Sequence, residues 1–126
     1  MTTDKKRPVN LNLISFKFPP MALVSIAHRI SGLLLFIFVP FLLWLLGSIH
    51  GSAAGFEQTG NFLSSGLMKL LAWVVMLSGI FHVLAGVRHL IMDMGMGEGL
   101  CAARASALIV MALFVLSIIL TGVWLW

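Results

Sequence analysis

The chain has 126 residues, of which 60% are hydrophobic and 10% charged, and its mean hydropathy is +1.09. A soluble domain of this length could not bury so much apolar surface, so the composition excludes an ordinary globular protein and indicates lipid as the main solvent. The formal net charge of +4 comes from basic residues in flanks and connections, which argues against a nucleic-acid-binding patch. One cysteine excludes an internal disulfide, a zinc site or an iron-sulfur cluster built by this chain alone.

Three apolar segments follow a basic N-terminal segment at residues 1–20. They lie at about residues 21–46, 64–93 and 105–126, and each is long enough for the ~20 residues that cross a bilayer. They must be helical, because lipid offers no partner to free backbone groups and three segments cannot close a barrel. The sequence therefore predicts an all-α integral membrane protein with three transmembrane helices in a single domain, residues 1–126.

Basic residues are distributed unevenly about these helices. The first connection has none before Lys69, whereas the second connection is flanked by Arg88 and Arg104. Four more precede the first helix: Lys5, Lys6, Arg7 and Lys17. By the positive-inside rule, we expect a cytoplasmic N-terminus and a C-terminus on the outer side. Anchoring at the interface is the simplest interpretation of Arg88 and Arg104.

Polar side chains recur along the first two helices at helical spacing. Ionisable groups are costly within a membrane span, so their positions point to function. The first helix carries four residues at i, i+3, i+4 and i+7: Ser25, His28, Arg29 and Gly32. The second helix carries a similar face: Gly79, His82, Gly86, His89 and Asp93. Two such faces predict a shared polar interior.

The rise of ~1.5 Å per residue gives these residues expected depths. His82 lies eleven residues before Asp93, so we expect it ~16 Å deep, near the bilayer midplane. The other polar residues are expected together at the cytoplasmic edge: Ser25, His28, Arg29, His89 and Asp93. This pattern predicts a polar cytoplasmic layer with one isolated imidazole below it.

Two interpretations of His82 remain open. A neutral histidine with a hydrogen bond between helices would be structural, whereas histidine is also the usual nitrogen ligand of haem iron. Gly79 and Gly86 leave room for a flat macrocycle, although they would equally serve close helix packing. His89 lies ~10 Å further along the same helix, so it cannot bind the same iron as His82. His28 is expected at the cytoplasmic edge, which makes it a poor candidate as well. A second axial ligand is therefore expected from a partner chain.

The polar layer above His82 has expected roles of its own. Three of its side chains could pair with haem propionates: His28, Arg29 and His89. Asp93 is expected to give polar support, by capping its helix or by pairing with Arg88 or His89.

Two runs of sequence resemble the cytochrome b membrane-anchor subunits of succinate dehydrogenase. They are SIAHRISG at residues 25–32, preceded by RPVNLNL at 7–13, and HVLAGVRHLIMD at 82–93. The order of these runs is specific in combination, and the likeness covers nearly the whole chain. It implies a heterodimeric helical anchor in the bacterial inner membrane, formed with a second small hydrophobic subunit and holding one haem b. It also implies an iron-sulfur subunit and a flavoprotein subunit docked on the cytoplasmic side.

The resemblance also implies roles for single residues. His82 would be the axial ligand of the haem iron, and the companion subunit would supply the other ligand. Ser25 and Arg29 would lie at the ubiquinone site, with His28 near the haem propionates. The alternative is that Ser25 hydrogen-bonds to its own helix and that Arg29 binds a lipid phosphate. The chain would serve electron transfer from succinate to ubiquinone, in the tricarboxylic acid cycle and respiratory chain, without itself oxidising succinate.

Other functions compete with this interpretation. The nearest alternative is the anchor of a fumarate reductase or of another quinone-linked dehydrogenase. A small transporter is disfavoured because the sequence shows no internal repeat and no pair of broken helices. A purely structural assembly subunit would leave His82 unexplained.

Overall fold

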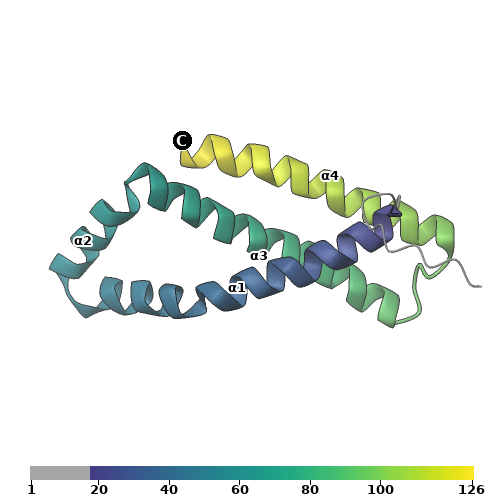
Figure 1. Cartoon of the computed structure of the whole chain (residues 1–126), viewed down its shortest axis with the longest axis horizontal. Coiled ribbons are helices and arrows are strands. Elements are labelled where there is room, and N and C mark those ends of the chain that lie inside the picture. The colour runs from purple at the N-terminus through teal and green to yellow at the C-terminus, as the bar shows by residue number, and fades with distance from the viewer. Residues whose placement is uncertain (1–17) are drawn as a thin grey trace, which may run out of the picture.

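The computed structural model describes residues 18–126 and contains four helices in that range (Figure 1). They are α1 (Pro20–Gly51), α2 (Ala53–Leu63), α3 (Gly66–Asp93) and α4 (Leu100–Leu125). Helices α1, α3 and α4 are each long and apolar enough to cross a membrane. The prediction of an all-helical chain with three membrane-spanning helices is therefore confirmed.

The N-terminal part of the chain carries predictions that the structure does not reach. The four basic residues before the first helix and the RPVNLNL run fall in residues 1–17, outside the described residues. The start of α1 is described, and Pro20 occupies its first turn. A proline fits there because the first amide groups of a helix have no intrahelical acceptor.

The helix boundaries differ from the predicted ones in the two connections. α1 continues to Gly51, and the short helix α2 forms where only a loop was expected. Ser52 separates the two helices because its backbone is extended, and its hydroxyl caps α2 by accepting a hydrogen bond from the amide of Gly55 at 3.0 Å. α4 begins at Leu100 instead of residue 105, since its first turn is rich in alanine and ends at an arginine, both good helix formers.

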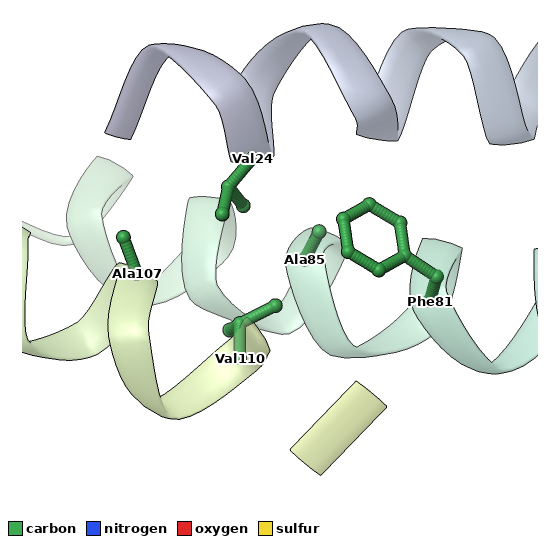
Figure 2. Packing of buried hydrophobic residues seen from close by; sticks show 5 residues of the cluster. All are labelled: Val24, Phe81, Ala85, Ala107 and Val110. Carbon is green, nitrogen blue, oxygen red and sulfur yellow. The ribbon is translucent and has the colours of Figure 1, made fainter. Parts of the chain in front are cut away.

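The three long helices pack closest in one half of the molecule. Figure 1 shows α1 crossing α3 near the N-terminal end of α1, while α2 joins the far ends of these two helices. The buried apolar cluster lies in this half and takes residues from all three long helices, as Figure 2 shows: Val24, Phe81, Ala85, Ala107 and Val110. Ala85 and Ala107 are fully buried, and their small side chains let the helices approach closely.

A second contact joins α3 and α4 at the opposite end. The indole Nε1–H of Trp73 donates to the hydroxyl of Thr121 at 2.8 Å, and that hydroxyl donates to the carbonyl of Ser117. Lys69 lies 5.9 Å from the ring centre of Trp126. Most large apolar side chains elsewhere are exposed, which suits a surface covered by lipid or by another membrane protein.

Candidate functional site

Three histidines meet where α1 packs against α3. The rings of His28 and His82 are stacked, with centroids 4.1 Å apart and an interplanar angle of 16°. The ring of His89 lies 5.2 Å from that of His28 in a tilted orientation. All three side chains are half-buried. The two predicted polar faces therefore do share an interior.

Hydrogen bonds from α1 fix one nitrogen of His82. The Nδ1–H of His82 can donate to the carbonyl oxygen of His28 at 3.2 Å, and the hydroxyl of Ser31 donates to the same oxygen at 2.8 Å. The Ser31 oxygen, also 3.2 Å from Nδ1, can share that proton. A neutral imidazole with its proton on Nδ1 keeps its lone pair on Nε2. No described residue hydrogen-bonds to Nε2.

This arrangement is the one that metal-binding histidines usually show. One ring nitrogen donates to a backbone carbonyl, which sets the ring orientation and leaves the other nitrogen free to bind a metal. The described residues contain no group of three or more His, Cys, Asp or Glu side chains that could hold a metal ion. His82 thus offers a single donor from the described residues, which would fit a haem iron, because the macrocycle itself supplies most of the ligands of that iron.

Glycines allow the two helices to approach at this point. A methyl group at Gly32 would come within 2.9 Å of Cε1 of His82, and one at Gly86 within 3.4 Å of Nε2 of His28. A methyl group at Gly79 would lie 4.0 Å from Leu35. In the described chain, the space at Gly79 and Gly86 is therefore used for packing of α1 against α3. The methyl group at Gly32 would make the shortest of these contacts, with the ring of His82.

The prediction that His82 is an isolated imidazole is wrong. The sequence placed His28 at the edge and His82 as an isolated imidazole below it, whereas the two rings are in contact. Counting residues from the helix ends predicts which side chains meet only if the two helices run side by side with level ends. α1 instead crosses α3 at an angle (Figure 1), which brings the two rings together. The stacked rings leave no room for a macrocycle between them, so His28 is still not the second ligand of an iron bound to His82.

His28 has an unusual feature of its own. Its Nε2 atom is buried and has no hydrogen-bond partner among the described residues. A buried polar atom without a partner costs free energy, on the order of 1–3 kcal/mol. This atom is therefore the point where the described chain most needs a polar group from outside.

Ser25 and Arg29 lie beside this cluster, one helical turn apart on α1. Ser25 is half-buried and Arg29 is exposed. Neither side chain hydrogen-bonds to another described residue, so both are free to contact a ligand or a partner. The alternative that Ser25 bonds its own helix is not seen in the described chain.

Three charged residues at this end of the molecule, Arg88, Arg104 and Asp93, differ in exposure and in hydrogen-bond partners. Arg88, expected to be an exposed anchor, is instead only 6% exposed and donates to Ser106 at 3.0 Å and to the carbonyl of Ala103 at 3.1 Å. Arg104 is exposed, as an anchor would be. Asp93 is exposed and forms no ion pair with Arg88 or His89 in the described part of the chain, so the expected pairing is not observed.

The sequence did not single out two serines that form hydrogen bonds with the polar residues of these helices. Ser31 supports His82, and Ser106 supports Arg88. Ser31 follows His28 by three residues, which already placed it within one turn of the polar face. Ser106 and Arg88 lie at similar distances from the connection between α3 and α4, but the predicted start of the last helix at residue 105 hid this match.

Comparison with known proteins gives a consistent picture. Residues 3–121 match the family described as succinate dehydrogenase/fumarate reductase transmembrane subunit. The chain is 44% identical over 124 residues to the succinate dehydrogenase cytochrome b556 subunit of Coxiella burnetii, covering 98% of this chain and 99% of the relative. It is 31% identical over 118 residues to the subunit of that name from Rickettsia felis, covering 87% and 92%. For the Paracoccus denitrificans subunit the identity is 30% over 115 residues, covering 91% and 88%.

Proposed function

The chain belongs to the succinate dehydrogenase/fumarate reductase transmembrane subunit family, and we propose that it anchors a succinate:ubiquinone oxidoreductase in the bacterial inner membrane. In this role it shares one haem b with a second hydrophobic subunit and contributes to the site of ubiquinone reduction. The names of its relatives support the haem, since they are cytochrome b556 subunits. The chain is a multi-pass membrane protein that acts as one anchor domain, with its N-terminus in the cytoplasm.

The observation that supports this proposal best is the hydrogen bonding of the two ring nitrogens of His82. Its Nδ1 is held by α1, and its Nε2 is left without a partner in the described chain. His82 would therefore hold the haem iron, and the second hydrophobic subunit would supply the opposite ligand. A bound haem b would add a one-electron carrier inside the membrane. The buried Nε2 of His28, with Arg29 and His89 nearby, would pair with the propionates.

Quinone reduction requires hydrogen-bond donors at a carbonyl oxygen and a positive charge where negative charge develops. The Ser25 hydroxyl and the Arg29 guanidinium supply these on one face of α1, and no described residue competes for them. Ubiquinone would take up two electrons and two protons there, with Asp93 adding polar support at the same end of the molecule. The electrons would come from succinate through a flavoprotein subunit and an iron-sulfur subunit docked on the cytoplasmic side.

The test of this proposal is the spectrum of the assembled complex. His82→Ala should abolish or strongly change the b-type haem band in the reduced-minus-oxidised spectrum, because the iron loses a ligand. His28→Ala and His89→Ala should keep the pigment and shift its potential. The matched control is His50→Ala, since His50 lies at the far end of α1 and bonds only Leu46 of its own helix. An unchanged band in assembled His82→Ala complex would remove His82 as the ligand.

A fumarate reductase anchor is the second candidate, because the family description includes both enzymes. The relatives named for succinate dehydrogenase favour succinate oxidation. The measurement that separates them is the ratio of succinate–ubiquinone to quinol–fumarate activity in the purified complex. We expect the first activity to be the larger.

A further inference from the structure

Arg88 is a buried cation that has no counter-ion in the described chain. Its guanidinium has five N–H donors, and two of them bond neutral acceptors, the Ser106 hydroxyl and the Ala103 carbonyl. The nearby acidic residues Asp93 and Glu98 are exposed and form no ion pair with it in the part of the chain that the structure describes. A buried charge is stable only when it is paired. An anion from outside the described chain would complete this site.

Arg88 also lines a cavity, and none of its nitrogen atoms is buried without a hydrogen-bond partner. A space of about 370 Å³ lies between α3 and α4, and Arg88 and Ser106 are part of its lining. Its other walls are almost entirely apolar and include Val83, Val87 and Leu113. Several of these side chains are half exposed or more, so the cavity is an open groove on the surface of the helices. From Val83 to Met92 it follows α3 for roughly 13 Å.

The position of Arg88 suits a lipid headgroup. Arg88 precedes the last residue of α3, Asp93, by five positions, which puts it roughly 7 Å inside the end of that helix. This depth is within reach of the interface for an arginine side chain. The first turn of α4 lies beside it, carries no acidic residue and has no side-chain cap. That turn lies outside the lining of the groove, which on α4 begins at Ser106, so Arg88 supplies the positive charge there.

We propose that the groove between α3 and α4 binds one anionic phospholipid, whose phosphate pairs with Arg88 and whose acyl chain lies along the apolar walls. The charge complementarity identifies the headgroup, and the length and apolar character of the groove identify the chain. A partner subunit with a carboxylate at this position is the competing occupant, and the second test below distinguishes it from lipid. This site lies on the α4 side of α3 and is independent of the haem and quinone assignments.

The first test measures retained lipid in the purified complex. Native mass spectrometry with added phosphatidylglycerol or phosphatidylcholine should show one tightly held phosphatidylglycerol. Arg88→Gln should weaken its binding about tenfold, as expected for losing a hydrogen-bonded charge. Arg104→Gln removes the same charge from an exposed position at the same end of the molecule and should leave this binding unchanged. Equal loss in both variants, or in neither, would overturn the proposal.

A second test does not depend on the folding of the Arg88 variant. Leu113→Trp places an indole in the wall of the groove while Arg88 stays intact. Phosphatidylglycerol brominated on its acyl chain should quench this indole in the assembled complex more strongly than brominated phosphatidylcholine. Absent or equal quenching by the two lipids would mean that protein covers the groove or that lipid binds there without selection, and either result would overturn the proposal.

Discussion

The imidazole of His82 is oriented by neutral groups of α1, the carbonyl oxygen of His28 and the hydroxyl of Ser31. Such an arrangement directs the Nδ1 side of the ring toward α1 and leaves Nε2 without a partner among the described residues. The same short segment of α1 carries Ser25 and Arg29, whose side chains are free in the described chain. One helical face therefore positions the proposed iron ligand and supplies the proposed quinone contacts.

Gly32 should be essential to the position of His82. In Gly32→Ala the added methyl group would come within 2.9 Å of the His82 ring, so the ring or α1 must move. We expect partial loss of haem and a shifted haem potential, measured by redox titration of the assembled complex. Gly47→Ala is the matched control, because it lies in the same helix and its methyl group would meet nothing within 4 Å. A Gly32→Ala complex with normal haem content and potential would contradict the observed packing.

Ser25 and Arg29 should matter for quinone reduction and not for the succinate oxidation that precedes it. Ser25→Ala and Arg29→Ala should each lower succinate-dependent ubiquinone reduction, by ~10-fold or more for the arginine, since a hydrogen bond to a charged group contributes ~1.5–3 kcal/mol. Succinate oxidation with an artificial dye that accepts electrons upstream should persist, because flavin and clusters belong to other chains. Arg104→Ala is the control for loss of an exposed arginine. A wild-type ratio of the two activities in both variants would exclude these residues from the site.

The pairs of helices are held together in different ways. α1 and α3 meet through histidines and glycines, which suits a site that must admit external groups. α3 and α4 meet through the buried Arg88 at one end and through the Trp73–Thr121 hydrogen bond at the other. Because lipid does not drive helices together by the hydrophobic effect, such polar contacts and close packing contribute most of the association.

The hydrogen bond between Trp73 and Thr121 should stabilise the packing of α4. Thr121→Val keeps the side-chain shape but leaves the indole N–H without an acceptor, so we expect a loss of ~1–2 kcal/mol. The thermal unfolding midpoint of the purified complex measures it. Ser117→Ala removes a hydroxyl that bonds only the carbonyl of Phe114 in the same helix and should have a smaller effect. Equal midpoints for the two variants would show that the bond between helices adds little.

At the scale of the whole molecule, the three long helices bury few of their apolar side chains. Large apolar side chains on the outer face of α1 are exposed, such as Leu33 at 60% and Phe36 at 74%. Lipid can cover such a surface, and so can the second anchor subunit that the proposed haem requires. The exposed faces of α1 and α3 are therefore where this partner would dock, next to His82.

The orientation of the chain in the membrane is a prediction from charge. Four basic residues precede the first helix, and the connection that contains α2 has no lysine or arginine. Since basic segments stay on the cytoplasmic side, a reporter enzyme fused after Trp126 should be active in the periplasm. Cytoplasmic activity of that fusion would contradict the predicted topology.

The three membrane helices, the two polar faces and the family could be predicted from the sequence, because lipid permits only a few backbone structures and because the motifs recur at helical spacing. The sequence did not determine α2, since hydropathy alone does not report the Ser52 cap that starts this helix. It also did not predict the ring contact between His28 and His82 or the burial of Arg88. Their surroundings depend on the crossing of α1 over α3 and on the approach of α4, which bring together residues distant in sequence. Residue counts along one helix give depth along that helix, whereas contacts between helices depend on their relative tilt and offset, which arise when the helices pack together.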